Sequence, residues 1–324
     1  MPTFVTASRR WDSVDDFLGA RENRYFGDGF RRGKIRFLAA GMAADGRIEG
    51  TGVVEYPGTW SVKAAGAQRL HLSTLDAYLL GVEAAAELLR GESSNGVERL
   101  VVPQAWVRRC VIKAGNAPIE DSLNNVPVSA VRVNATSEIG VVHSISVTVG
   151  NMLVSLAIES SNASSSPDHI QDGNGSFSSY ATDLRDVRVG SEFDQISATA
   201  KVSRHDYGVG EAGGLESAYG GSLTFAEAFA DMLQLGQIGL YLMDGITRED
   251  SKTLWMRSTR FETRSPIRPR RDEVVSTSIR SPRIVHKDGA RWRVATLSSD
   301  RGPMTLTCSV AHELPSDEVG GGRG

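Results

Sequence analysis

Acidic and amide side chains interrupt an otherwise apolar stretch at residues 222–245, SLTFAEAFADMLQLGQIGLYLMDG. This segment has the length and composition of a long buried helix. At 100° per residue, Glu227, Asp231 and Gln234 lie within about 60° of one another and share one face. The acids either form a narrow solvated stripe or reach a cleft near the start of the helix. In the second case, Glu227 or Asp231 would deprotonate a substrate hydroxyl as a general base.

The start of this helix also offers groups that acyl-transfer chemistry requires. Glu227 falls in the second turn, where the helix dipole favours a carboxylate. Backbone N–H groups around Ser222, Leu223 and Thr224 would stabilise an oxyanion there. Upstream, in SRHDYGVG, His205 is either a solvated loop residue or another catalytic member of the site.

A second long helix is predicted over residues 71–91, HLSTLDAYLLGVEAAAELLRG. Ser73 or Thr74 can cap its start, and a glycine follows its last turn. His71 and Asp76 flank the cap. Asp76 either only complements the helix dipole or acts as a catalytic base with His71 beside it. The sequence does not decide which of the two helices holds the active site.

Residues 252–293 carry ten arginines and two lysines against four acids. They form either solvated strand faces or a docking surface for an anionic partner, such as an acyl carrier protein or the phosphates of coenzyme A. Arg257 and Arg260, on the strand expected after the second helix, are candidates for binding the acceptor or the pantetheine phosphate. Few aromatic residues are interleaved with these charges, so a nucleic-acid partner is not expected.

The predicted elements repeat once along the chain. Each half shows a strand, a long apolar helix and then consecutive strands, which indicates the α+β class with an antiparallel sheet against each helix. A sheet wrapped around a long apolar helix is the hot-dog arrangement, so we predict a double hot dog with two long central helices. The expected boundaries are an N-terminal half at 1–160, a linker or mobile loop at 161–190, a C-terminal half at 191–314 and a disordered tail at 315–324.

Composition excludes several classes of protein. Of the 324 residues, 40% are hydrophobic and 23% charged, as in soluble globular proteins, and the net charge of -3 is not that of a nucleic-acid-binding polyelectrolyte. Cys110 and Cys308 lie far apart without metal-like spacing, so no disulfide framework, metal or cofactor is predicted. Neither a signal segment nor a long apolar run is evident, so we expect a cytoplasmic monomer or homodimer without membrane contact.

The N-terminal stretch SVDDFLGARENRYFGDGFRR resembles the opening of the AvrD family, the avirulence D proteins of plant-pathogenic pseudomonads and their actinobacterial relatives. HLSTLDAYLLGVEAA and LTFAEAFADMLQLGQ are also similar in kind and placement. The resemblance implies a biosynthetic role in forming syringolides, in which a β-ketoacyl thioester is joined to a ketopentose such as xylulose. A-factor type butyrolactone synthases look mechanistically related, because these hot-dog proteins transfer a β-ketoacyl group to a sugar-phosphate hydroxyl.

Three functional hypotheses follow. The first is transfer of a β-ketoacyl group from an acyl carrier protein or coenzyme A to a sugar-like hydroxyl. The second is a hot-dog dehydratase or thioesterase, since EAFAD resembles the EAMAQ helix segment of acyl carrier protein dehydratases. The GHFP turn that precedes that helix is missing here, which argues against dehydration. The third is a non-catalytic module that binds an acyl chain or a lactone.

Overall fold

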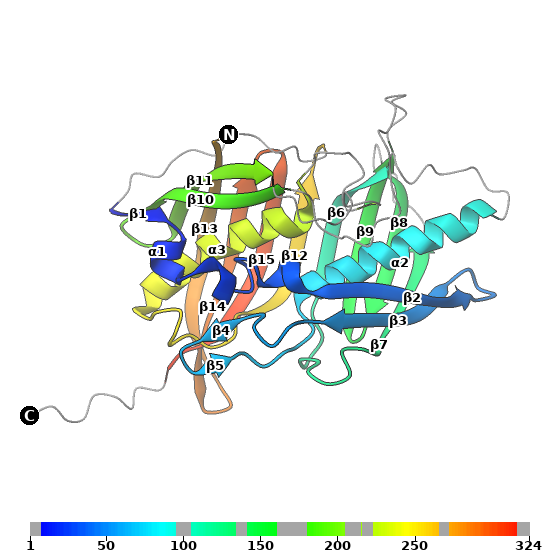
Figure 1. Cartoon of the computed structure of the whole chain (residues 1–324), viewed down its shortest axis with the longest axis horizontal. Helices are drawn as coiled ribbons and strands as arrows, with labels where there is room; N and C mark the ends of the chain where they lie inside the picture. The colour runs from blue at the N-terminus through cyan, green and yellow to red at the C-terminus, as the bar shows by residue number, and fades with distance from the viewer. Residues whose placement is uncertain are drawn as a thin grey trace, which may run out of the picture.

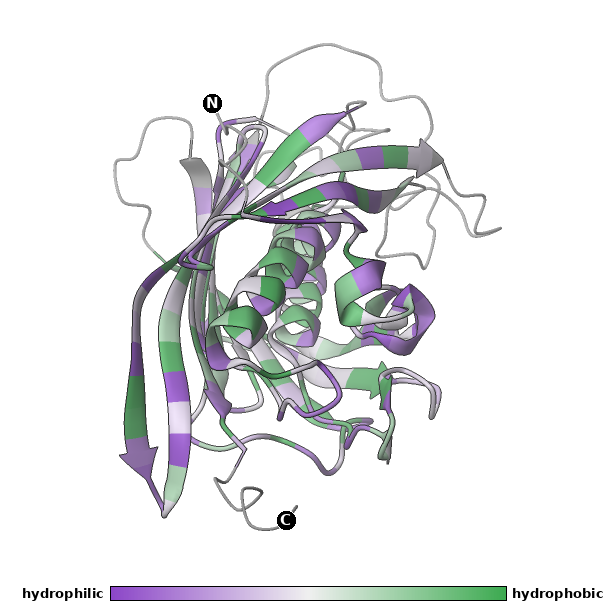
Figure 2. Cartoon of the chain, turned by 90° about the vertical axis from the view of Figure 1, so that its left-hand side faces the viewer, coloured by the Kyte–Doolittle hydropathy of each residue, from purple (hydrophilic) through white to green (hydrophobic). Residues whose placement is uncertain are grey.

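One large antiparallel sheet of 13 strands dominates the molecule (Figure 1). It curves around two long helices, α2 and α3, which lie on its concave side (Figure 2). The predicted α+β class with a large antiparallel sheet is therefore confirmed. The computed structural model describes residues 8–94, 105–133, 141–160, 180–204, 215, 223–265 and 272–315.

The long helices and the strands around them occur as two consecutive sets. The first set comprises β2 (Lys34–Met42), β3 (Ile48–Glu55), α2 (Thr74–Ser94), β6 (Ala105–Lys113), β7 (Val126–Val133), β8 (Val141–Val149) and β9 (Met152–Ser160). The second set comprises β10 (Tyr180–Val189), β11 (Gln195–Arg204), α3 (Phe225–Asp244), β12 (Trp255–Thr263), β13 (Glu273–Lys287), β14 (Ala290–Arg301) and β15 (Met304–Glu313).

The two sets have the same topology. Their strand orders in the sheet are β2-β3-β7-β8-β9-β6 and β10-β11-β13-β14-β15-β12. In each set, the strand that follows the helix lies at the inner edge. These two strands, β6 and β12, pair antiparallel with Phe261 opposite Cys110 and join the sets into one sheet. The sequence-based expectation of a repeated helix-and-strand unit therefore agrees with the observed order.

Helix α3 is apolar because nearly all of it is enclosed. Its buried positions run almost without interruption from Phe225 to Tyr241. Gly236 allows close packing on the sheet, since a Cβ atom there would lie 2.6 Å from Leu297 Cδ1 on β14. Helix α2 is likewise buried on most of its surface, and it continues past Gly91, where we expected it to end.

The N-terminal segment lies with the second set of strands, although it precedes the first. It comprises β1 (Arg9–Ser13), α1 (Asp15–Leu18) and two 3-10 turns, η1 (Arg21–Asn23) and η2 (Gly29–Arg32). Strand β1 pairs with β10, and α1 packs against α3. The expected N-terminal half, 1–160, therefore contributes an edge strand to the other half of the sheet.

The expected linker at 161–190 is wrong over residues 180–189. Residues 180–189 form β10, where Leu184, Val187 and Val189 are buried against the core. The polar stretch at 161–179 and the tail beyond 315 lie outside the described residues.

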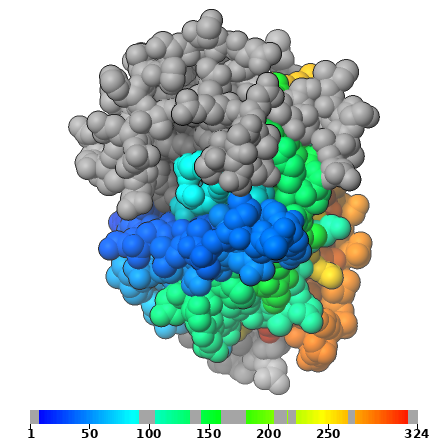
Figure 3. All heavy atoms as spheres, turned by 90° about the vertical axis from the view of Figure 1, so that its right-hand side faces the viewer, coloured from blue at the N-terminus to red at the C-terminus, as the bar shows by residue number. Residues whose placement is uncertain are grey.

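The opposite edge of the sheet is strand β2, which crosses the face seen in Figure 3. Leu38 and Met42 on this strand are 52% and 40% exposed. A short two-stranded ribbon, β4 (Val62–Lys63) and β5 (Gly66–Ala67), lies apart from the main sheet. Among the described residues, no helix is both long enough and apolar enough to cross a membrane.

Candidate functional site

Glu227 is almost completely buried and is part of the N-terminal cap of α3. Its carboxylate accepts hydrogen bonds from Thr224 N and Thr224 Oγ1, while Glu227 N donates to Thr224 Oγ1, which forms a capping box. Arg31 Nη1 lies 2.5 Å from Glu227 Oε1. The charge of Glu227 is thus matched by a buried arginine from the N-terminal segment.

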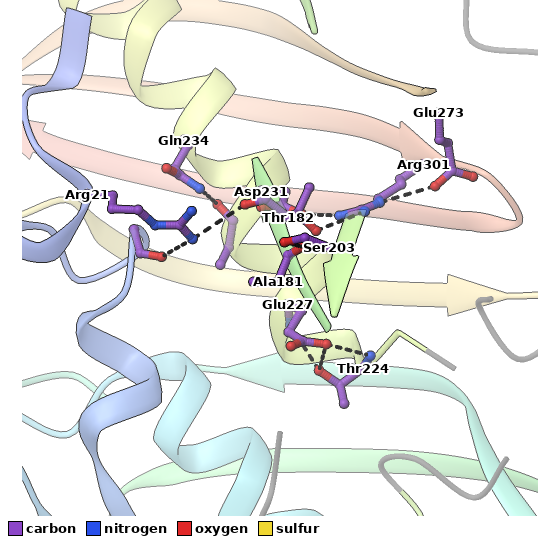
Figure 4. A network of polar contacts seen from close by, with 12 residues as sticks. Arg21, Ala181, Thr182, Ser203, Thr224, Glu227, Asp231, Gln234, Glu273 and Arg301 are labelled. Atoms are coloured by element: carbon purple, nitrogen blue, oxygen red, sulfur yellow. Dashed lines mark hydrogen bonds and ion pairs between the residues drawn. The ribbon is translucent and has the colours of Figure 1, made fainter. Parts of the chain in front are cut away.

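One turn further along the helix, Asp231 is paired with Arg301 of β14 (Figure 4). The Arg301 side chain is 0% exposed, and it also approaches Glu273 Oε2 at 3.3 Å and Thr182 Oγ1 at 3.1 Å. These contacts join α3 to β10, β13 and β14. Two carboxylates and a hydroxyl thus surround the buried guanidinium. They accept hydrogen bonds from N–H groups that burial would otherwise leave unpaired.

Gln234 connects α3 to the N-terminal segment. Arg24 Nη1 donates to Gln234 Oε1 at 2.7 Å, and Arg24 Nη2 pairs with Asp15. Burial lowers the pKa of Arg24 to about 10, and the neighbouring charge of Asp15 opposes that shift. Arg24 is only 3% exposed, so both partners are needed to offset its desolvation.

The acids of α3 are not a solvated stripe, so that alternative is wrong. Glu227 and Asp231 are 1% and 5% exposed, and each has its own arginine partner. Neither of them lines the pocket described below. Their catalytic role stays a prediction, while their observed contacts are those of structural ion pairs.

Asp76 occupies the equivalent position at the start of α2 but has different partners. Ser73 N donates to Asp76 Oδ2 at 2.8 Å and Asp76 N donates to Ser73 Oγ at 3.1 Å. The other carboxylate oxygen accepts from Tyr56 Oη at 2.7 Å and from Tyr25 Oη at 3.4 Å. Asp76 is fully buried, and within the described ranges no arginine or lysine forms an ion pair with it.

The environment of Asp76 raises its proton affinity above that of an exposed carboxylate. Burial raises its pKa, and the hydrogen bonds from Tyr56 and Ser73 only partly oppose this shift. Burial and the nearby Asp76 charge also raise the pKa values of Tyr25 and Tyr56, so both phenols stay protonated. Tyr25 Oη lies 2.7 Å from Ser73 Oγ and 3.3 Å from Tyr56 Oη, which makes one connected set of hydroxyls around the carboxyl group.

A pocket of about 100 Å³ opens beside this hydroxyl cluster. Tyr25, Ser73 and His71 are among its lining residues, and the hydroxyls of Tyr25 and Ser73 contact the Asp76 carboxyl or backbone N–H. Its apolar and aromatic lining comes from several elements, and so do its cations. These residues are Phe26, Trp60, Tyr241, Leu254 and Met256, and Arg24, Lys63, Arg248 and Lys252.

His71 lies at the pocket wall, as the hypothesis of a site at the first helix requires. Its ring packs between Trp60 and Trp255, with centroid distances of 5.9 and 5.1 Å. His71 Nδ1 lies 3.2 Å from the Arg69 carbonyl oxygen. Of the predicted catalytic residues that the structure describes, His71 lines this pocket, and Asp76 contacts the lining residues Tyr25 and Ser73.

Comparison with family models identifies the family of this chain. A family model described as Pseudomonas avirulence D protein (AvrD) matches residues 9–315. The chain belongs to the AvrD family. A search of curated proteins found no match.

Several solved structures are similar to this AvrD-family chain at low sequence identity. One is a tesB protein of Mycobacterium avium subsp. paratuberculosis, at 9% identity and a TM-score of 0.45, covering 90% of this chain and 100% of that chain. A protein of unknown function with a hot-dog fold from Alicyclobacillus acidocaldarius shows 11% identity and a TM-score of 0.41, with 90% and 98% covered. A 12:0-ACP thioesterase from Umbellularia californica shows 12% identity and a TM-score of 0.43, with 84% and 99% covered.

The predicted substrate-binding residues that the structure describes do not line the pocket. Arg257 and Arg260 are exposed on β12, where Arg260 pairs with Glu262 at 2.7 Å. Leu223 and Thr224 are buried, and Thr224 N is already hydrogen-bonded to Glu227, so that N–H is not free to stabilise an oxyanion. Ser222 and His205 lie outside the described residues.

Sequence reasoning missed four residues that shape the site of this AvrD-family chain. Tyr25 and Tyr56 hold Asp76, while Arg24 and Lys63 belong to the pocket lining. The stretch RENRYFGDGFRR, with arginines and aromatics in a glycine-rich turn, was a usable signal for two of them. Tyr56 and Lys63 carry no local pattern, because only the tertiary fold brings Tyr56 to Asp76 and Lys63 to the pocket.

Neither cysteine lines the pocket. Cys110 and Cys308 are both buried and unbridged. Burial raises the pKa of the Cys308 thiol to about 12, so it is not a thiolate nucleophile at neutral pH. The described part of the chain holds no group of three or more histidine, cysteine or acidic side chains placed to bind a metal ion.

Proposed function

We propose that this AvrD-family chain transfers a β-ketoacyl group from an acyl carrier protein or coenzyme A thioester to a sugar-like hydroxyl, yielding a syringolide-like or butyrolactone-like signal. Membership of the AvrD family supports the reaction class. The observation that carries the proposal is the fully buried Asp76 carboxyl, joined by hydroxyls to a pocket with apolar and cationic walls. The repeated strand order further supports two hot-dog units, each built around one of the long helices.

Asp76 would act as the base through the hydroxyls that separate it from the pocket. The acceptor hydroxyl binds beside Ser73 and Tyr25, and its proton passes through these hydroxyls to the Asp76 carboxylate. Burial raises the pKa of Asp76, so it is a stronger base than an exposed carboxylate. The acceptor oxygen attacks the thioester carbonyl, the C–S bond breaks, and the proton returns to the departing thiolate sulfur.

The remaining pocket residues suit the two substrates. Phe26, Leu254 and Met256 offer an apolar wall for the acyl chain. His71, held by two tryptophan rings, lines the same pocket and would relay this proton from Asp76 to the leaving sulfur. The active site would therefore belong to the first helix, α2, rather than to α3.

The test is a pair of assays with purified protein, β-ketoacyl thioesters of coenzyme A and of a carrier protein, and either xylulose or dihydroxyacetone phosphate. Thiol release and adduct mass are measured with and without the acceptor. Acceptor-dependent release together with an acylated sugar supports the proposal. Release without an acceptor would instead identify a thioesterase, and no release with any combination would overturn the assignment.

Two matched variants locate the site. Asp76→Asn and Glu227→Gln each replace the acid of a helix-capping box by its amide. The proposal requires Asp76→Asn to abolish transfer while Glu227→Gln, in protein shown to be folded, retains it. The opposite result would move the site to α3.

A further inference from the structure

Positive charge gathers at one part of the pocket, around the loop that follows α3. Lys63, Arg248 and Lys252 line this part, and Arg24 lines the pocket from the N-terminal segment. Within the described part of the chain, no aspartate or glutamate lines the pocket. A half-enclosed pocket lined with cations and lacking lining acids favours an anionic ligand group.

Two of the four cations are already neutralised by nearby carboxylates. Arg24 pairs with Asp15, and Arg248 pairs with Glu249 at 3.0 Å. The other Arg248 nitrogen donates to the carbonyl oxygens of Asn23 and Val62 at 2.7 and 2.9 Å. Arg248 therefore holds the loop against the N-terminal segment and the β4–β5 ribbon, which fixes the position of its neighbours.

The two lysines are not paired in this way. Lys63 Nζ donates to Ser251 O at 2.5 Å and to Ser251 Oγ at 2.9 Å, which uses two of its three N–H groups. Burial, followed by the charge of Arg248, lowers the pKa of Lys63 to about 8. Lys252 is exposed at the rim. Asp250 acts on Lys63 only at longer range, since its carboxylate binds Thr247.

Arg24 offers a further donor at the pocket. It is only 3% exposed, and its Nη atoms are used by Gln234 and Asp15. Its Nε, by contrast, has no hydrogen-bond partner among the described residues. A buried guanidinium N–H without a partner is costly, so a ligand oxygen that reached it would be stabilised.

We propose that Lys63, Lys252 and Arg24 form a subsite for the phosphate group of a phosphate ester. The inference rests on the proposed function in one respect, which is that the same pocket holds the reacting substrate. The unpaired positive charges of Lys63 and Lys252 together match a phosphate dianion. Ser251 and Arg248 would position Lys63 and the loop without contacting the ligand.

Two substrates of the proposed reaction could supply this phosphate. One is a phosphorylated sugar acceptor, and the other is the phosphopantetheine arm of the acyl donor. Both present a tetrahedral phosphate ester at the end of a small flexible chain. Both ligands would bind the subsite through the same phosphate chemistry, so direct binding measurements must show which of the two the pocket takes.

The experiment measures binding by calorimetry with no turnover. Dihydroxyacetone phosphate is compared with dihydroxyacetone, and phosphopantetheine with pantetheine. In at least one pair, the phosphorylated member should bind about tenfold or more tightly, because a charge-assisted hydrogen bond contributes on the order of one power of ten in affinity. The pair that shows the difference identifies the source of the phosphate.

Three lysine variants complete the test. Lys63→Met and Lys252→Met should each reduce the affinity for the phosphorylated ligand about tenfold without changing that for its dephosphorylated partner. Lys201→Met, an exposed lysine on β11 outside the pocket, is the control and should have no effect. Lys252 is exposed, so its variant remains informative if loss of the Ser251 contact unfolds Lys63→Met.

Equal affinities within both pairs would overturn the subsite, and so would full phosphate affinity in a folded Lys252→Met variant. Because no acyl transfer is measured, these outcomes are independent of the proposed reaction. A protein that binds the phosphate ester but transfers nothing would keep the subsite and reject the reaction. A protein that transfers the acyl group but shows no preference for phosphorylated ligands would keep the reaction and reject the subsite.

Discussion

The starts of α2 and α3 are built from the same local device but differ in what surrounds the acid. Each has a hydroxyl residue at the cap and an acid three residues later, Ser73 with Asp76 and Thr224 with Glu227. Glu227 meets the Arg31 guanidinium, whereas Asp76 meets the phenols of Tyr25 and Tyr56. Ser73 at the α2 start lines the pocket, whereas neither Thr224 nor Glu227 at the α3 start does.

Under the proposed function, the same motif serves stability at the start of α3 and chemistry at the start of α2. A carboxylate paired with a buried arginine is held in its charged form and has little tendency to take up a proton. A buried carboxyl that receives only neutral hydrogen bonds has a raised proton affinity, and hydroxyls connect it to the pocket. In the proposed function, this contrast leaves α3 with a structural role and gives proton transfer to α2.

The largest expected effect concerns the Asp76 carboxyl itself. Asp76→Asn should reduce the rate of acyl transfer by roughly 10²- to 10⁴-fold, the usual contribution of a general base. Steady-state kinetics with a saturating thioester measures the loss. Glu227→Gln serves as the control and should stay within a few-fold of the parent rate. Equal losses in the two variants would remove the contrast between the helices.

Substitution of Glu227 in the α3 cap should lower the stability of the protein rather than its activity. Glu227→Gln deprives Arg31 of its carboxylate, so the free energy of unfolding should fall by about 3 kcal/mol, as when one partner of a buried ion pair is removed. Urea denaturation followed by circular dichroism measures this change. Combining Glu227→Gln with Arg31→Met should recover part of the loss, and strict additivity would argue against direct coupling.

Removing one phenol should shift the pH dependence of catalysis. The hydrogen bond from Tyr56 lowers the pKa of Asp76, so Tyr56→Phe should raise it. The base must be ionised, so the acidic limb of the kcat/KM profile should move to higher pH. Tyr241→Phe, in a pocket-lining tyrosine that contacts Ser251 rather than Asp76, should leave that limb in place.

The smallest effect is a pH dependence of folding stability. Asp76 has a folded-state pKa above its ordinary value of 3.8, so the folded protein binds more protons than the unfolded chain between those two values. Its contribution to stability is therefore fully present at low pH and is lost as pH rises through the folded-state pKa.

Denaturant titrations at a series of pH values, with Asp76→Asn as the reference, isolate this contribution. The stability of the parent relative to the variant should decline with rising pH, by at most about 1.4 kcal/mol per pH unit. A difference that increases with pH would show that the folded state holds Asp76 in its charged form.

The sequence predicted most of the architecture. Both long helices were visible as extended apolar segments with caps, and the four strands after α3 alternate strongly enough to be placed within a few residues. Strand β10 was missed because it directly follows a polar stretch that reads as a linker. Thr224 and Glu227 lie three residues apart, and the capping box they form lies at the predicted start of the second helix.

The site was less accessible to prediction for a physical reason. Helical periodicity placed Glu227 and Asp231 on one face, but it could not reveal that Arg31 and Arg301 approach that face from distant segments. Similarly, Asp76 looked like an ordinary first-turn acid until the fold brought Tyr56 to it. Charge partners decide the role of a buried acid, and these partners are set by tertiary contacts.

The pairing of β1 with β10 has a consequence for how the protein is made. Arg9 lies opposite Val189, and Arg24 binds Gln234, so the N-terminal segment has no complete partner until the second set of strands is synthesised. Contacts this distant in sequence form late, because closing such a loop carries a large entropic cost. Tyr25 and Arg24 belong to that segment, so a nascent chain acquires its pocket only after α3 has left the ribosome.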